Sequence, residues 1–266
     1  MNNCRKWGKP PYKVVVAHGG PGMPGSVAPV ARELASDYGV LEPLQSAGSV
    51  DGQIKELAAV LQKTADPPVI LIGWSWGSTL ALLTAAQYPR LVRKLILVCG
   101  APLQKKYREN VYIAKLDRLT EDERKEVFAL EDIVFRDTPG DKSASLARLF
   151  TIFSKADSYD LITYTDEVLE YQVDINKSVG IESHKLYAGT DLLKVLAAIR
   201  CPVVAINGDS DTRPAEGIKE PLEHVVKDFR FIMLDKCGHM PWYEKYAREK
   251  FFEVLREEII HGLAGD

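Results

Sequence analysis

Short, continuous runs of apolar residues constrain the fold of this chain more than any other feature. The sequence contains VVVA, VILIG, LILV and VVAING, which begin at residues 14, 69, 95 and 203. A strand with one face in water alternates apolar and polar residues, whereas these runs have no polar face. Segments with apolar residues at helical spacing separate most of them. The pattern predicts a mostly parallel sheet that is covered by helices on both faces, which is an α/β fold.

The strand–helix alternation stops near residue 102 and resumes near residue 200. The residues between are charged, rich in tyrosine and helix-like, as in EDERKEVFALEDIVF and TDLLKVLAAI. A chain of 266 residues is long enough for one large α/β domain with an insertion. We interpret residues 1–102 and 200–266 as one α/β core and residues 103–199 as a helical cap inserted into it.

Composition excludes several classes of partner. The formal charge of −3 and the pI near 6.0 give no reason to expect nucleic acid or an anionic membrane as partner. The four cysteines are scattered, without the spacing of a metal site or a disulfide framework. The apolar run before His18 is too short for a secretory signal. We therefore expect a cytoplasmic protein without a metal or an organic cofactor, acting on a small molecule or a short peptide.

The motif Gly73-x-Ser75-x-Gly77 lies between a predicted strand and a predicted helix. This is the context of a nucleophile elbow, in which a sharp turn exposes a serine hydroxyl at the carboxyl end of the sheet. Ligands of α/β folds bind at this end. The N-terminus of the following helix favours negative charge there. The motif predicts Ser75 as a nucleophile.

A serine nucleophile needs a base, and the base needs a carboxylate that orients it. His239 follows a predicted strand in DKCGHMPWYE, and Asp209 and Asp211 follow another in INGDSD. His18 also follows a strand, in the loop HGGPG, where we expect it to brace the loop by hydrogen bonding. The order serine, aspartate, histidine along the chain is typical of one lineage of catalytic triads.

An acyl-transfer site also needs backbone N–H donors for the oxyanion. Trp76 follows the predicted nucleophile directly and is expected to supply one of them. The glycine-rich loop at residues 18–22 is expected to supply the other, because glycines let its backbone approach the substrate closely.

These motifs together resemble the α/β-hydrolase superfamily, and within it the proline iminopeptidase branch. The residues that carry the resemblance are HGGPG at 18–22, GWSWGS at 73–78, the aspartate of GDSD and the histidine of GHMPWYE. The resemblance implies Ser75 as nucleophile, His239 as base and Asp211, rather than Asp209, as the orienting acid. It also implies that Gly20 and Trp76 donate to the oxyanion.

The resemblance implies a serine hydrolase that forms an acyl-enzyme and releases an N-terminal residue from a peptide or amide. The alternative is a carboxylesterase, lipase-like enzyme or thioesterase that acts on a small acyl ester. A protein that has this fold and only binds a ligand is a third possibility. Burst kinetics with a chromogenic acyl ester would separate the third from the first two.

The chain departs from the proline iminopeptidase pattern in three places. Trp74 replaces a glycine in the nucleophile motif, and the sequence GGE of the branch is absent. Only about ten residues precede the first predicted strand, so the antiparallel strands that usually open this fold are expected to be missing. The predicted substrate-binding residues are Gly19 and Trp74 with the cap acids Glu131, Glu167 and Glu170, chosen from a wider acidic set that includes Asp132, Asp166 and Asp174.

Overall fold

The computed structural model describes residues 3–136, 138–163, 165–189 and 191–264, and its centre is a seven-stranded sheet. The strand order is β1-β3-β2-β4-β5-β6-β7, and every neighbouring pair is parallel except β1 with β3. The predicted mostly parallel sheet is confirmed. The strands are β1 (Cys4–Trp7), β2 (Val14–Ala17), β3 (Val40–Pro43), β4 (Val69–Trp74), β5 (Val92–Val98), β6 (Val203–Gly208) and β7 (Phe229–Leu234).

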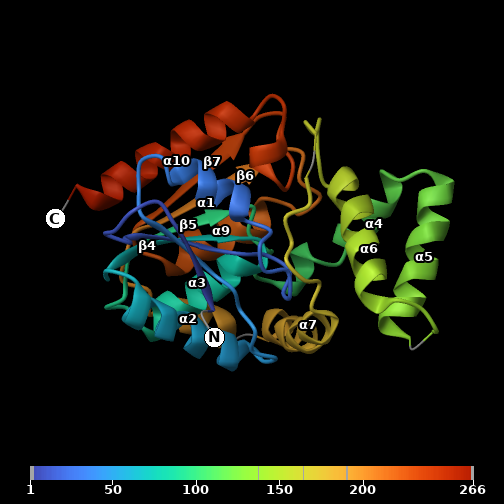
Figure 1. Ribbon diagram of the computed structural model, residues 1–266, viewed down its shortest axis with the longest axis horizontal. Coiled ribbons are helices and arrows are strands. Elements are labelled where there is room, and N and C mark those ends of the chain that lie inside the picture. The colour runs from blue at the N-terminus through green and yellow to red at the C-terminus, as the bar shows by residue number, and fades with distance from the viewer. Residues whose placement is uncertain (1–2, 137, 164, 190, 265–266) are drawn as a thin grey trace.

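Helices cover both faces of the sheet, as the apolar runs require (Figure 1). On one face, α1 (Ala28–Leu34) and α10 (Arg248–Leu263) pack in one hydrophobic cluster with β2, β4 and β5. On the other face lie α2 (Val50–Thr64), α3 (Trp76–Gln87), α8 (Asp191–Leu196) and α9 (Glu216–Val225). No helix in the described ranges is long and apolar enough to cross a membrane.

The expectation that the opening antiparallel strand is missing is wrong. β1 pairs antiparallel with β3 at the edge of the sheet. Its sequence, CRKW, lacks an apolar run, because an edge strand is only partly buried. Arg5 and Trp7 instead donate hydrogen bonds to the buried carboxylate of Glu42 on β3, at 2.8–3.0 Å.

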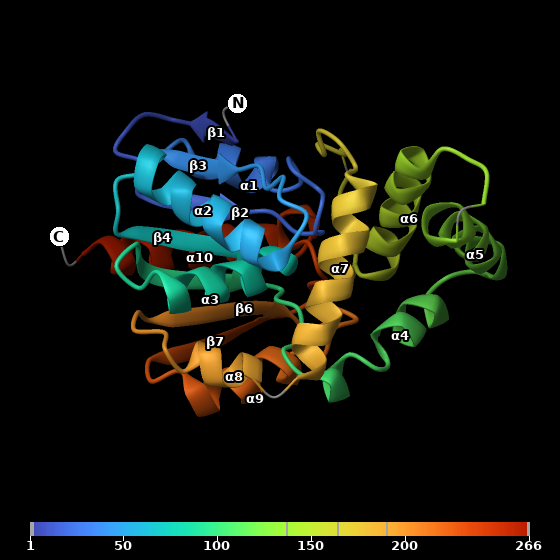
Figure 2. The same cartoon turned by 90° about the horizontal axis from the view of Figure 1, so that it is seen from below.

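The segment between β5 and β6 is helical, as predicted, and stands at the end of the sheet (Figure 2). Its first helices pack on one another around a hydrophobic cluster of their own, whereas α8 and buried side chains of α7 belong to the cluster beside the sheet. The helices are η1 (Lys105–Tyr107), α4 (Val111–Asp117), α5 (Glu121–Phe135), α6 (Lys142–Ala156) and α7 (Val173–Ala188), with η2 (Pro241–Tyr243) following β7.

The register of the sheet brings the predicted functional loops together. Ala17 lies beside Gly73 and Trp74 beside Val98, while Gly208 lies beside Leu234. The loops that follow β2, β4, β6 and β7 therefore all leave the sheet at the carboxyl end of its parallel strands. This end faces the helical segment, so any site there is built from both parts of the chain.

The turn at Gly77 is packed too tightly for any side chain. A Cβ atom on Gly77 would lie 2.4 Å from the carbonyl oxygen of Ala17 and 2.6 Å from that of His18. We predict that Gly77→Ala lowers the free energy of unfolding by about 1–3 kcal/mol, because the backbone must shift. Urea unfolding followed by circular dichroism would measure the change.

Gly180 on α7 provides the matched control, since no atom apart from its chain neighbours and the backbone of its own helix lies within 4 Å of a Cβ placed there. Gly180→Ala is expected to raise the free energy of unfolding by about 0.5–1 kcal/mol, because alanine loses less entropy in a helix. Equal stability of the two variants would contradict the close packing at the turn.

Candidate active site

Ser75 occupies the sharp turn between β4 and α3. Its backbone has φ 55° and ψ −118°, a conformation that costs energy for any residue except glycine. A Cβ atom on Gly73 would lie 2.3 Å from the carbonyl oxygen of Gly77. The Ser75 side chain makes no capping hydrogen bond to α3. It lines a large cavity at the carboxyl end of the parallel strands. This is the geometry that the sequence motif predicts.

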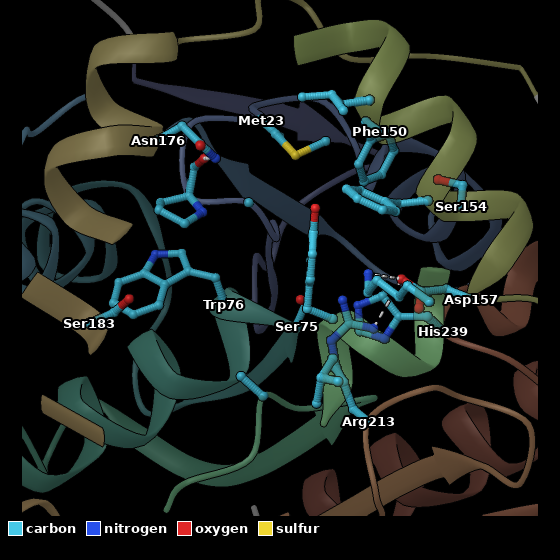
Figure 3. Close-up of a pocket in the computed structure, with 18 of the residues that line it drawn as sticks. Met23, Ser75, Trp76, Phe150, Ser154, Asp157, Asn176, Ser183, Arg213 and His239 are labelled. Atoms are coloured by element: carbon cyan, nitrogen blue, oxygen red, sulfur yellow. Dashed lines mark hydrogen bonds and ion pairs between the residues drawn. The ribbon is translucent and has the colours of Figure 1, made fainter. Parts of the chain in front are cut away.

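Figure 3 shows His239 beside Ser75, on the side of Asp157 and Arg213, and it also lines the cavity. Its Nδ1 atom is 2.6 Å from Oδ2 of Asp211, and both side chains are buried. Asp209 has a different partner set, because its carboxylate accepts the backbone N–H groups of Lys236 and Cys237 at 3.0 and 3.1 Å. The structure thus pairs His239 with Asp211, whereas Asp209 ties together the loops after β6 and β7.

Burial keeps the imidazole of His239 neutral. It lowers the pKa of His239, and the Arg213 guanidinium lowers this pKa further, against the attraction of Asp211. Burial raises the pKa of Asp211, but the interaction with His239, which includes a hydrogen bond, and the charge of Arg213 outweigh it and hold this pKa below its ordinary value. The Nδ1–H group therefore donates to the Asp211 carboxylate, and Nε2 is left as a proton acceptor.

The loop after β2 is braced from two sides. The ring of His18 lies 2.8 Å from the carbonyl oxygen of Gly19 and accepts the backbone N–H of Gln45 at 3.3 Å. Burial lowers the pKa of His18 to about 4, so the ring is neutral and Nδ1–H is the donor. Asn176 on α7 donates to the carbonyl oxygen of Pro21 at 2.8 Å. His18 thus fits the bracing role that the sequence indicates.

Gly20 and Trp76, the two predicted oxyanion donors, both line the cavity with Ser75. Gly20 has φ 110°, a conformation that side chains rarely adopt. The indole Nε1 of Trp76 donates to Gln53 at 2.8 Å, which fixes the start of α3 against α2. Their donation to an oxyanion stays a prediction.

Trp74 supports the catalytic histidine candidate. Its indole Nε1 donates to the carbonyl oxygen of His239 at 2.8 Å, and its ring lies 5.1 Å from the ring of Trp242. The ring also lines the cavity. The prediction for Gly19 needs correction, because Gly19 does not reach the cavity wall. A Cβ atom there would lie 2.6 Å from the Trp74 ring, so this glycine makes room for the tryptophan.

The predicted cap acids differ in whether they line the cavity. Glu131 lines the cavity, where its carboxylate accepts the hydroxyl of Tyr112 at 2.7 Å. The predictions for Glu167 and Glu170 are corrected, since neither residue lines it: Glu167 pairs with Arg32, and Glu170 is exposed. The remaining acids, Asp132, Asp166 and Asp174, do not line it either.

Sequence reasoning missed Asp157, which ends α6 in the helical segment. Its backbone carbonyl accepts the N–H of His239 at 2.8 Å. Its carboxylate pairs with Lys115 and Thr212 and lies 3.1 Å from an Arg213 nitrogen. Arg213 in turn donates to Asp211 from its backbone N–H at 2.9 Å and from its guanidinium at 3.0 Å. No local motif marks these residues, because they meet only in the folded chain.

The cavity has a volume of about 600 Å³, and apolar side chains form most of its wall. Helix α6 supplies much of that wall, and the loop after β2 supplies Met23. Figure 3 shows Met23 and Phe150 on the side opposite Arg213. The apolar side chains of the wall include Met23, Val111, Leu146, Leu149, Phe150 and Phe153.

One group of potential metal ligands occurs in the described ranges: the possible ligand atoms of Cys99, Asp211 and His239 lie within 4.8 Å of one another. Asp211 and His239 already bond to each other. Burial and the nearby Asp211 charge raise the pKa of the Cys99 thiol well above its ordinary value. A metal needs the thiolate, so the group is better suited to a catalytic pair than to a metal site.

The model of the alpha/beta hydrolase fold family matches residues 12–246. The chain belongs to this family. It is 26% identical to a monoacylglycerol lipase of Bos taurus over 72% of this chain, and the match spans 56% of the lipase. It is also 26% identical to a pimeloyl-[acyl-carrier protein] methyl ester esterase of Aromatoleum aromaticum, over 77% of this chain and 78% of the esterase.

The proline iminopeptidase of Mycobacterium smegmatis has the same fold, with a TM-score of 0.63 and 18% identity over 99% of this chain and 96% of that chain. It is one of many structures that match, and esterases and lipases are among them. The predicted α/β-hydrolase fold and the hydrolase class agree with these relatives. The finer likeness to proline iminopeptidases is not specific.

The two aspartates of this hydrolase are predicted to differ in their effect on catalysis. Asp211→Asn should lower kcat for a chromogenic ester by about 10⁴-fold, because an amide favours the wrong imidazole tautomer. Asp209→Asn should lower kcat far less, since Asp209 does not contact His239. Steady-state kinetics of both variants test this, and the reverse ranking would move the orienting acid to Asp209.

The pH dependence of kcat/KM should report the depressed pKa of His239. The acid limb is predicted to have its midpoint below pH 6.5, because burial and Arg213 both lower this pKa. Arg213→Met removes the repelling cation, so the limb should move to higher pH. Lys63→Met, at an exposed position on α2, should leave the limb in place. A limb that does not move in Arg213→Met would contradict the assignment.

Proposed function

We propose that this hydrolase is a serine carboxylesterase that cleaves small acyl esters through an acyl-enzyme on Ser75. The apolar wall of the cavity above Ser75 is the observation that carries the proposal. Such a wall favours a hydrocarbon chain, since burial of each CH₂ group contributes roughly 0.8 kcal/mol. The curated relatives, a lipase and methyl ester esterases, support the same substrate class.

The first half of the reaction forms the acyl-enzyme. Nε2 of His239 accepts the proton of the Ser75 hydroxyl as the oxygen attacks the acyl carbon. The carbonyl oxygen becomes negative, and the backbone N–H groups of Gly20 and Trp76 stabilise it. Asp211 holds the imidazole by its Nδ1–H group and stabilises the imidazolium. His239 then gives the proton to the leaving alcohol, and the C–O bond breaks.

The second half repeats these steps with water. His239 accepts a proton from the water molecule as its oxygen attacks the acyl carbon. The Ser75 oxygen leaves and takes the proton back from the imidazolium. The products are the alcohol and the carboxylic acid, and the enzyme returns to its starting state without a metal or a cofactor.

One observation favours a second function, the release of an N-terminal residue. An aminopeptidase must bind the substrate ammonium, and a buried ammonium needs a carboxylate partner. Glu131 is the single predicted cap acid that lines the cavity. Burial raises the pKa of Glu131, however, which makes its charged form harder to maintain. We therefore place the esterase first.

Two substrates separate these functions. We predict that p-nitrophenyl butyrate is hydrolysed with a much higher kcat/KM than proline p-nitroanilide. Ser75→Ala should lower kcat by roughly 10⁴-fold or more while the protein stays folded. A fluorophosphonate adduct mapped by mass spectrometry should lie on Ser75. If the proline substrate is preferred and Glu131→Gln removes that preference, the aminopeptidase function holds instead.

A further inference from the structure

Arg108 is a cation of the cavity wall that has no carboxylate partner. The cavity is lined by Arg108, Lys115 and Arg213 among its basic residues. Lys115 and Arg213 both pair with Asp157. No ion pair of Arg108 occurs in the part of the chain that the structure describes. Glu131, the other carboxylate of the lining, accepts from Tyr112 instead.

The contacts of Arg108 hold the guanidinium in place without neutralising it. The guanidinium carbon lies 4.0 Å from the centre of the Tyr187 ring, and one terminal nitrogen donates to the carbonyl oxygen of Pro102 at 3.2 Å. Tyr187 is itself fixed by Thr79, whose hydroxyl lies 2.8 Å from the phenol oxygen. Nε of Arg108 is buried and has no hydrogen-bond partner in the described structure.

An unpartnered cation of this kind is unfavourable in the unliganded protein. Burial lowers the pKa of Arg108, and the nearby Arg213 lowers it as well. An arginine nevertheless stays charged in proteins. The Arg108 side chain is only partly buried, so water solvates part of its charge, while its buried Nε–H group has no partner. Buried charges in proteins are normally paired. An anion that enters the cavity would supply the missing partner.

A neutral histidine lines the cavity together with Arg108. His184 on α7 lines the same cavity, and burial together with the Arg108 charge lowers the pKa of His184. The ring is therefore neutral near pH 7 and can donate or accept a hydrogen bond. Arg108 and His184 together form a positive, hydrogen-bonding part of a wall that is mostly apolar.

We propose that Arg108 binds a carboxylate carried by the substrate, so that the ester cleaved at Ser75 has one negative charge away from the scissile bond. This inference rests on the proposed esterase function and names its substrate class. A guanidinium carries five N–H groups in a planar fork, and a carboxylate is an anion whose two oxygens match such a fork. One unpaired cation balances one anionic group. The apolar wall then accommodates the hydrocarbon between the carboxylate and the ester.

Matched ester pairs test the proposal. Mono-p-nitrophenyl adipate is compared with its methyl ester. The carboxylate of mono-p-nitrophenyl adipate lies on the acyl side of the scissile bond. In the second pair, 4-carboxyphenyl butyrate is compared with its methyl ester. The carboxylate of 4-carboxyphenyl butyrate lies on the alcohol side of the scissile bond. For at least one pair, Arg108→Gln should lower kcat/KM of the carboxylate substrate by about 10- to 100-fold, the value of a charge-assisted hydrogen bond. The neutral member should change by less than about threefold.

Two further variants serve as controls. Arg108→Lys keeps the charge without the fork and should retain part of the preference for the carboxylate. Lys106→Gln removes an exposed charge on the neighbouring turn, outside the cavity. It should leave unchanged the ratio of kcat/KM for the carboxylate substrate to kcat/KM for its methyl ester. Thermal unfolding should show that all three variants are folded. An unchanged ratio in Arg108→Gln for both pairs overturns the proposal.

A binding measurement separates this proposal from the proposed reaction. Ser75→Ala is titrated with monomethyl adipate by calorimetry, with and without Arg108→Gln. Binding that depends on Arg108 supports the carboxylate site even if ester hydrolysis proves slow. Hydrolysis of neutral esters that depends on Ser75, without any Arg108 effect in either assay, leaves the esterase standing and rejects the carboxylate site. Phosphate that binds Arg108 in place of monomethyl adipate would also reject it.

Discussion

A buried network of charges joins the candidate catalytic pair to the helical segment above it. Arg213 lies between Asp211 and Asp157, and Lys115 approaches Asp157 from α4. The four residues carry two positive and two negative charges, so the network is balanced. Removing one partner of such a pair leaves an uncompensated buried charge and costs about 3–5 kcal/mol. The orientation of His239 therefore depends on residues from both parts of the chain.

The same dependence explains how the cavity keeps its shape. The backbone carbonyl of Asp157 accepts the N–H of His239, and Glu244 accepts the N–H groups of Tyr159 and Gly238. The loop between α6 and α7 is thus bound to the loop that carries the histidine. Because α6 also supplies much of the apolar wall, the position of the wall relative to Ser75 is set by these polar contacts. The contacts of Asp157 and Glu244 therefore fix both the apolar wall and the loop that carries His239.

The tryptophans beside Ser75 have separate structural tasks. Trp74 holds the backbone of His239 and forms part of the cavity wall, whereas Trp76 is anchored to Gln53 beneath α3. The glycine at position 19 leaves space for the Trp74 ring. In the proline iminopeptidase pattern a glycine stands at position 74, so this replacement enlarges the apolar surface near Ser75. Added apolar surface suits the hydrocarbon chain of the ester proposed above better than it suits an ammonium group.

The sequence by itself determined the features that depend on local pattern. Continuous apolar runs require strands buried on both faces, and the two glycines around Ser75 are the residues that a strained turn admits, so the sheet and the position of the serine could be predicted. The charged edge strand β1 could not, because its stability comes from pairing with β3. The resemblance already favoured Asp211 over Asp209, and the structure added its bond to His239. The positions of Glu167 and Glu170 outside the cavity, and the lack of an ion pair of Arg108 among the described residues, were decided by tertiary structure alone. Charge pairing depends on distances of a few ångströms between residues far apart in the chain, and only the packing of the helices on the sheet sets those distances.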